Sequence, residues 1–303
     1  KMALNRALFT KQLNLGLNTV FGMEYDRYPE QWRSLYSTEQ SMKAFEEDVQ
    51  MIGFGAAPTK AEGAMINYDS GREGFVSRYV HETVALAFAI TEEAEEDGLY
   101  GSLGAKYARA LARSMQQTKE IKGANIFNNA TTTSTGGDGL ALMNGSHPLG
   151  GGGTASNILG TPADLSETSL ETLLVQISTA VDDRSIPVAL SGRKLAVPPQ
   201  LVFVAERIIK SNLRPGTADN DINAMRNMGM IPEGVVVNQR FTNPDQYFIL
   251  TDCPDGMKHF VRAPIKKAVE GDFETGNLRY KCRERYSFGF TDWRGVYGSE
   301  GVA

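Results

Sequence analysis

The fold is decided by a stretch that reads Met65-Ile66-Asn67-Tyr68, then Asp69-Ser70-Gly71-Arg72-Glu73-Gly74, then Phe75-Val76-Ser77-Arg78-Tyr79-Val80. The outer segments are rich in strand-forming residues and the middle one in turn-forming residues, which predicts a β-hairpin. The second arm runs on to Ile90 and predicts a strand of about 16 residues, or about 50 Å at ~3.3 Å per residue. Strands usually have ~5–6 residues, and a compact domain does not cover such a ribbon with its own core. We therefore expect another copy of the chain to cover the hairpin.

A long helix is predicted to follow, from about Ser102 as N-cap to Asn128. The acidic run 92–97 precedes it, where the helix dipole favours negative charge, and this reading is preferred over a metal or nucleotide site. The apolar stripe of the helix is predicted to consist of Leu103, Tyr107, Leu111, Met115, Thr118 and Ile121. Its exposed side is predicted to be basic, with Lys106, Arg109, Arg113, Lys119 and Lys122.

The segments before the hairpin are predicted to be an extended arm and a short helix. Residues 1–40 mix short apolar runs with aromatic residues, and Pro29 interrupts any long helix. Residues 41–51 predict a helix, because Met42, Phe45, Val49 and Ile52 are spaced by 3, 4 and 3 residues.

The second half of the chain predicts mixed helix and strand. Glycine-rich segments at 131–139 and 145–161 read as loops. A helix is expected to open at Ser166, and a strand over 194–197 is followed by a second helix at Pro198-Pro199. Further strands are expected at 235–237, 247–250 and 257–262, and two long strand-like runs between 266 and 297. The chain is therefore predicted to be an α+β protein.

Composition narrows the class of protein. The 303 residues are 41% hydrophobic and 22% charged, with a net charge of −5, which argues against a protein that coats nucleic acid. Two cysteines give no disulfide framework and suit a reducing compartment. No apolar run approaches the ~20 residues that span a bilayer, and no signal peptide is visible.

The search for catalytic or metal-binding motifs finds no complete site. His147, in Ser146-His147-Pro148, has no nucleophile-elbow serine beside it. Cys253, His259 and Cys282 lack the paired spacing of zinc ligands. The run 219–223 resembles the start of an EF-hand loop, but Ala224 and Met230 replace the glycine and glutamate that the loop needs. We expect no enzyme activity, no cofactor and no metal.

The order of the predicted elements resembles the tailed-phage major capsid proteins of the Hong Kong 97 type. Nearly the whole chain takes part in the resemblance. The phrases that carry it are Phe127-Asn128-Asn129-Ala130, Gly137-Asp138-Gly139-Leu140, His147-Pro148, Leu195-Ala196-Val197-Pro198-Pro199, Pro215-Gly216-Thr217-Ala218-Asp219-Asn220-Asp221-Ile222-Asn223 and Tyr286-Ser287-Phe288-Gly289-Phe290-Thr291-Asp292-Trp293-Arg294-Gly295.

The resemblance implies a division of labour along the chain. Residues 1–52 would form an N-terminal arm with a short helix, and residues 53–90 an extended loop that lies across a neighbouring subunit. The peripheral domain, with a spine helix, would comprise 91–130 and 263–285. The axial domain would comprise 131–262 and 286–303.

The resemblance also implies a function. The chain would be a major capsid protein that assembles, as hexamers and pentamers, into an icosahedral shell around double-stranded DNA in the host cytoplasm. Its partners would be portal, scaffolding and decoration proteins, with non-specific DNA contact and no membrane. The residues expected at inter-subunit contacts are Asp69, Arg72, Glu73, Arg78, Arg109 and Arg113.

Two alternatives are an encapsulin compartment shell, which shares the fold, and a soluble α+β enzyme with its active site in loops 131–161 and 211–230. One family member joins its subunits covalently through an extended-loop lysine. Lys60 is the only lysine between 53 and 90 and lies at the base of the predicted hairpin. We therefore expect no such cross-link.

Overall fold

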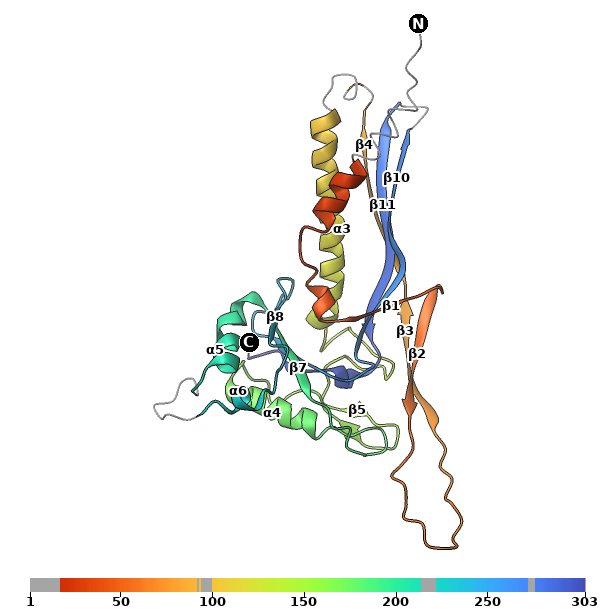
Figure 1. Cartoon of the computed structure of the whole chain (residues 1–303), viewed down its shortest axis with the longest axis vertical. Coiled ribbons are helices and arrows are strands. Elements are labelled where there is room, and N and C mark those ends of the chain that lie inside the picture. Colours follow the sequence, from red (N-terminus) through yellow and green to blue (C-terminus); the bar gives the residue numbers. More distant parts are fainter. Residues whose placement is uncertain (1–16, 92, 94–99, 214–221, 272–275, 303) are drawn as a thin grey trace.

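The computed structural model describes residues 17–91, 93, 100–213, 222–271 and 276–302. The molecule is elongated, with a helix and a long sheet at one end and a mixed α/β unit below them (Figure 1). A loop projects beyond the second unit, away from the helix end. Most of the acidic run 92–97, the N-terminal part of the predicted arm and most of the EF-hand-like run lie outside the described residues.

The first unit is built on helix α3 (Tyr100–Asn128) and a four-stranded sheet, here called the long sheet. Its strand order is β1-β10-β11-β4. The strands are β1 (Ser37–Gln40), β4 (Glu82–Ile90), β10 (Met257–Gly271) and β11 (Leu278–Phe290). The predicted helix and the two long C-terminal runs are confirmed, although the helix begins two residues before Ser102. The strand predicted at 257–262 is not separate, because it continues into the first run as the single strand β10.

The buried stripe of helix α3 agrees only in part with the predicted one: Leu111 and Met115 are buried as expected, and Ala108 and Ala112 join them. Ala108, Leu111, Ala112 and Met115 pack against the long sheet, whereas Tyr107 and Ile121 are 47% and 41% exposed. The predicted stripe missed these alanines because they are small. Close packing of a helix on a sheet favours small residues at the contact.

Lys119 is buried, contrary to the prediction of an exposed basic side. Its Nζ lies 3.5 Å from Oε2 of Glu284, and burial is the main factor that raises the pKa of that carboxyl group. Lys119 is buried because the N-terminal segment covers this side of the helix. The backbone N–H groups of Gln31 and Trp32 donate to Glu120 at 2.8 and 3.1 Å, which fixes the N-terminal segment over α3.

The N-terminal segment is less extended than predicted. Residues 17–25 are helical, and η1 (Trp32–Ser34) is a short 3-10 helix before β1. Phe21 is fully buried between the sheet and the helix, in contact with Tyr280. Most large apolar residues of this segment are therefore core residues of its own subunit, although Met23 and Tyr28 are exposed.

The hairpin consists of β2 (Phe45–Ile52) and β3 (Arg72–Val80), joined by residues 53–71. The predicted helix over 41–51 is wrong, because pairing with β3 overrides a weak helical pattern. The predicted single strand over 75–90 is also wrong: it breaks at His81, where β3 leaves the hairpin and β4 joins β11. Residues 65–68, predicted as one arm, form no strand.

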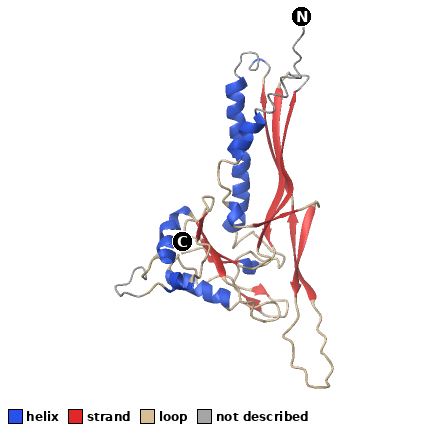
Figure 2. Cartoon of the chain, in the orientation of Figure 1, coloured by secondary structure: helices blue, strands red, loops and turns tan. Residues whose placement is uncertain are grey.

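The second unit contains a short sheet with strand order β12-β9-β7-β8. Its strands are β7 (Gly192–Val197), β8 (Val235–Val237), β9 (Tyr247–Thr251) and β12 (Val296–Ser299). Helices α4 (Glu167–Ser178), α5 (Val202–Lys210) and α6 (Ala224–Met228) surround it, with the one-turn η2 (Pro199–Leu201) and η3 (Trp293–Gly295) (Figure 2). A small ribbon is formed by β5 (His147–Pro148) and β6 (Thr154–Ala155).

The sequence predicted most of this unit correctly. Helix α4 begins with a capping box between Ser166 and Ser169, and Leu170, Leu173, Leu174 and Ile177 of its predicted stripe are buried. Val181, predicted as the last member of the stripe, lies beyond the end of the helix and is half-buried. Strand β7 ends before Pro198, as expected, because Pro198 and Pro199 have no backbone N–H to donate. The core of this unit is one continuous cluster that also reaches Trp32 and Phe127 at the foot of α3. The two units therefore share a core.

Candidate inter-subunit surfaces

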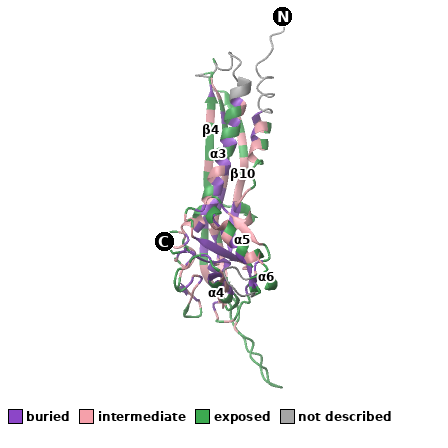
Figure 3. Cartoon of the chain, turned by 90° about the vertical axis from the view of Figure 1, so that its left-hand side faces the viewer, coloured by how far each residue is buried: buried purple, intermediate pink, exposed green. Residues whose placement is uncertain are grey.

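The loop of the hairpin, residues 53–71, exposes large apolar side chains. Phe54, Met65, Ile66 and Tyr68 are 66%, 87%, 68% and 94% exposed. Figure 3 shows the loop as a thin, wholly solvent-facing projection below a buried core. Apolar groups gathered on a projection of this kind mark a surface that binds another molecule.

The base of the loop is tied to its own subunit. Asp69 accepts hydrogen bonds from the backbone N–H groups of Gly55 and Ser70 and pairs with Arg184 at 3.2 Å. Arg72 donates to the backbone carbonyl of Gly150. These two predicted contact residues therefore hold the loop in place from within.

The other predicted contact residues lie exposed on two elements. Glu73 and Arg78 are on β3, where the Arg78 guanidinium lies 4.1 Å from the centre of the Phe45 ring and 3.9 Å from Glu47. Arg109 and Arg113 are exposed on α3. Their role between subunits stays a prediction.

The glycine-rich loops receive the hairpin. A Cβ on Gly137 would come within 2.8 Å of the backbone of Val76, and the Gly137 N–H donates to Ser77 Oγ at 3.2 Å. A Cβ on Gly150 would meet the Ile52 side chain at 2.3 Å. Gly137 and Gly150 are therefore glycines because two chain segments touch there, whereas Gly152 and Gly153 lie in open space with φ of 104° and 88°, a backbone conformation that favours glycine.

Four polar residues form the hairpin root: Asp48, Tyr79, Lys258 and Thr291. Thr291 Oγ1 lies 2.7 Å from both the Tyr79 hydroxyl and Asp48. The Lys258 side chain is 7% exposed and bonds Asp48 and, at 2.9 Å, Asp255. Buried, charge-assisted hydrogen bonds have narrow geometry, so the root fixes the direction in which the hairpin leaves the subunit.

His81 stands where the ribbon changes sheets. Its ring nitrogens lie 3.0 Å from Ser287 Oγ and 2.9 Å from Ser41 Oγ, and Ser41 donates to Glu46 at 2.7 Å. Burial lowers the pKa of His81. The neutral ring thus joins β11, β2 and the bend between β3 and β4.

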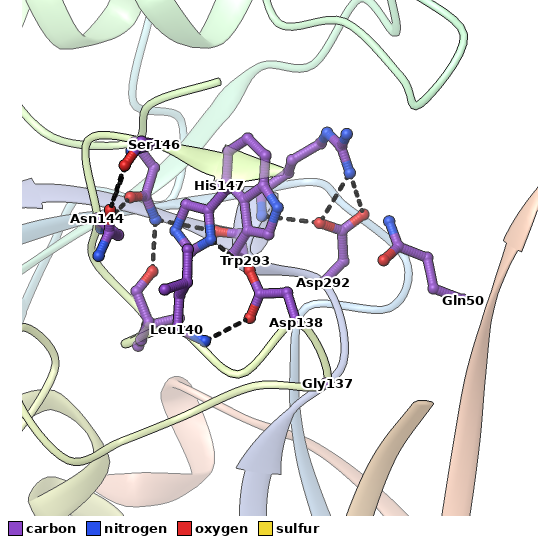
Figure 4. A network of polar contacts seen from close by, with 12 residues as sticks. Gln50, Gly137, Asp138, Leu140, Asn144, Ser146, His147, Asp292 and Trp293 are labelled. Atoms are coloured by element: carbon purple, nitrogen blue, oxygen red, sulfur yellow. Dashed lines mark hydrogen bonds and ion pairs between the residues drawn. The ribbon is translucent and has the colours of Figure 1, made fainter. Parts of the chain in front are cut away.

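A second buried network links the hairpin to the second unit (Figure 4). Gln50 of β2 donates to Asp183 at 3.1 Å. Asp183 also faces Arg294 at 3.6 Å, and both Nη1 contacts from Arg294 to Asp292 are 3.2 Å. The Arg294 side chain is only 3% exposed. This arginine sits between two carboxylates, one of which holds the hairpin.

His147 lies beside this network and has a structural environment. Its Nδ1 is 2.6 Å from Asp138 Oδ2, and its ring stacks on Trp293 with centroids 4.4 Å apart (Figure 4). The ring is fully buried. Ser146 bonds Asn144 instead of the histidine, so these residues do not form a hydrolytic site.

The predicted zinc-ligand candidates do not come together. Cys282 is buried in the cluster between the long sheet and α3, whereas His259 stacks on Phe288 with centroids 4.4 Å apart. Within the described ranges, no three or more His, Cys, Asp or Glu residues gather as metal ligands. No helix of the described residues is long and apolar enough to cross a membrane.

His259 makes stability depend on pH. Burial lowers its pKa to about 3, against ~6.5 in an unfolded chain. Between these values the unfolded state binds a proton that the folded state does not, so stability falls as the pH drops from about 6.5 towards 3. At ~1.4 kcal/mol per pKa unit, the loss over this whole range is on the order of 5 kcal/mol.

The measurement is thermal unfolding of the wild type and His259→Phe between pH 7 and pH 4. Phenylalanine suits a site walled by Trp32 and Phe288, and the variant should lose less stability on acidification than the wild type. Equal pH slopes would show that His259 titrates normally in the folded state.

Local sequence patterns do not predict these networks. Asp183 is far from the other two residues in the chain, and Asp292 and Arg294 look like ordinary turn charges. Only the tertiary fold brings the three side chains together and buries them. A usable signal was the Thr-Asp-Trp-Arg-Gly run at 291–295, in which a charged pair flanks a tryptophan.

A family profile described as "Phage capsid protein" matches residues 75–299, which is more than half of the chain. The chain belongs to this family. Sequence comparison of this capsid protein with curated proteins finds no match.

Solved structures of phage particles and of a virus-like particle share the fold of this capsid protein. A Mycobacterium phage Adephagia chain matches with a TM-score of 0.55 and 12% identity, covering 91% of each chain. A virus-like particle from Pyrococcus furiosus gives 0.53 and 11%, covering 94% of this chain and 98% of that one. A procapsid chain of bacteriophage JBD30 gives 0.51 and 14%, covering 99% and 77%.

The predicted α+β, Hong Kong 97-type fold is confirmed, and so is the assignment as a phage major capsid protein. The capsid protein is a structural component of the virion, and its family builds the shell of the phage head. The alternative of a soluble enzyme is not needed to explain any feature of the described residues.

Proposed function

We propose that this capsid protein works only through its contacts, as hexamers and pentamers that close around packaged double-stranded DNA without a catalytic step or cofactor. The observation that carries the proposal is the hairpin. Its loop offers four large apolar side chains to solvent, while buried bonds at Asp48 and Gln50 hold its strands rigidly. A rigid arm with an apolar end suits docking on a neighbour, since little order is lost on binding.

The parts of the chain then have separate roles. Residues 45–80 form the extended loop that lies across the neighbouring subunit, because β4 belongs to the long sheet. The unit around α3, with 263–285, is the peripheral domain. Residues 131–262 and 286–303 form the axial domain around the five-fold and six-fold centres.

A shell protein of this kind is expected to have other proteins as partners. Portal and scaffolding proteins would act during assembly in the host cytoplasm, and a decoration protein could strengthen the shell. The net charge of −5 suits a wall that holds DNA without binding it tightly. Glu73, Arg78, Arg109 and Arg113 are exposed and available for contacts between subunits.

Subunits are expected to stay free of covalent cross-links. Lys60 lies exposed in the loop, but a cross-link needs a matching partner on the neighbour. Denaturing electrophoresis of boiled shells should give a single band near the 33.1 kDa of the chain. A ladder of multiples that disappears in Lys60→Arg would contradict this expectation.

The function is tested by the size and content of the purified protein. Light scattering and negative-stain microscopy should show closed particles tens of nanometres across, as expected for shells of many copies. Particles from infected cells should contain DNA. A stable monomer under all conditions would contradict the shell, and a protein cargo in place of DNA would favour the encapsulin-type alternative.

A further inference from the structure

Strand β4 (Glu82–Ile90) leaves one side of the long sheet open. It pairs with β11 residue for residue, from Glu82 with Tyr286 to Ile90 with Leu278 and without a bulge. It is the last strand of the sheet, and on its other side no backbone group of the described residues bonds to it. An edge of this kind presents unpaired N–H and C=O groups to solvent.

The sequence of β4 does not protect this edge. Natural edge strands are usually guarded by lysine, proline or a bulge, yet Val84-Ala85-Leu86-Ala87-Phe88-Ala89-Ile90 has no charge, proline or glycine. Leu86 is 46% exposed, and Ala85, Ala87 and Ala89 are exposed as well. A flat, uncharged edge is the kind of surface that accepts another strand.

The hairpin loop holds a segment that lacks a strand partner. Residues 64–68 form no strand and make no β-pair within their own subunit, although Ile66 and Tyr68 favour strands. The loop and the upper part of β4 lie at opposite ends of the molecule (Figure 1). A strand from this loop can therefore reach β4 only in a second copy.

The charges around the two segments are complementary. Ala85 and Ala87 of β4 pair with Arg283 and Lys281 of β11, and both basic residues are exposed. Glu62, two residues before the loop segment, is exposed and carries the opposite charge, whereas the exposed Lys60 lies farther from the segment. A strand added beside β4 would bring this carboxylate towards Lys281 and Arg283.

We propose that residues 64–68 of one copy add as a fifth strand to the free edge of β4 in a second copy. This proposal rests on the proposed role of the hairpin between subunits and specifies how the hairpin binds. Backbone hydrogen bonds would supply affinity, while Met65, Ile66 and Tyr68 would cover the apolar strand.

The first test is cysteine cross-linking in assembled shells. Facing residues of paired strands have Cα atoms ~4.5–5.5 Å apart, which falls within disulfide range. Cysteines at 65, 66 or 67 are combined with cysteines at 85 or 87, and non-reducing electrophoresis should show multimers for at least one combination. The single-cysteine variants control for pairing with the natural Cys253 and Cys282.

The second test uses the unaltered protein, so it does not depend on assembly of the variants. Amide hydrogen exchange of 84–90 should slow about tenfold or more between free subunits and shells, because new backbone bonds protect the edge. Shells that form without cross-links, or without protection of these amides, would overturn strand addition and leave the shell function standing. Failure of the wild type to form shells would instead overturn the proposed function.

Discussion

Replacing residues 56–67 by a Gly-Ser-Gly linker is expected to abolish closed shells and leave a folded, soluble subunit. The deletion removes Met65 and Ile66, which contact little in their own subunit, and keeps Asp69, which ties the loop base to Arg184. A fully buried side chain of this size contributes ~1.5–3 kcal/mol, and the loss recurs at every copy in the shell. Light scattering measures whether closed shells form, and circular dichroism measures whether the subunit stays folded.

A matched control separates apolar contact from loop length. Met65→Ser combined with Ile66→Ser keeps the loop intact and should also weaken assembly, so that shells form only at higher protein concentration. Met42→Ser, at an exposed methionine outside the loop, should assemble like the wild type. Normal shells from the deletion would show that the hairpin loop is not needed for assembly.

Arg294→Met is expected to destabilise the subunit by about 3–5 kcal/mol, the usual cost of breaking a buried ion pair. The substitution leaves Asp292 and Asp183 buried without their cation, and the Val181 carbonyl without its 2.9 Å hydrogen bond. Denaturant unfolding followed by circular dichroism measures the change in the free energy of unfolding.

Two further variants show whether the cost comes from the unpaired charges. Adding Asp292→Asn to Arg294→Met should recover part of the lost stability, because one buried carboxylate is neutralised. Lys106→Met, at an exposed position of α3, should change stability by less than ~0.5 kcal/mol. A loss below ~1 kcal/mol in Arg294→Met would mean that water reaches the network in solution.

The sequence predicted the elements whose signals are local. Helix α4 has its capping box and its apolar stripe in one window, and β7 ends at a proline pair. The long helix and the strands β10 and β11 were visible from their length alone. These elements, in order, were enough to indicate the fold class.

The errors arose where distant residues decide the structure. Residues 45–52 carry a helical pattern, but β3 offers them a complete set of strand partners. The ribbon over 75–90 reads as one strand, yet it changes sheets at His81 because its two halves meet different partners. Burial of Lys119 depends on Glu284, 165 residues away in the chain, and no local pattern reports such a contact.

The candidate contact residues show the same limit. Asp69 and Arg72 bond Arg184 and Gly150 of their own subunit, which the sequence did not indicate, and their predicted contact with a neighbour stays a prediction. The exposed apolar residues of the loop, which carry the proposed contact, were read as a hairpin arm instead. Exposure is a property of the fold, and the sequence alone does not show it.

We propose above that the hairpin loop of each subunit lies on a neighbouring copy. The decisive measurement is a cryo-electron microscopy map of shells assembled from this chain. We expect ordered density for 53–71 against another subunit, with Met65, Ile66 and Tyr68 buried in the contact. Density that folds the loop back onto its own subunit, or closed shells in which the loop touches no neighbour, would contradict the claim.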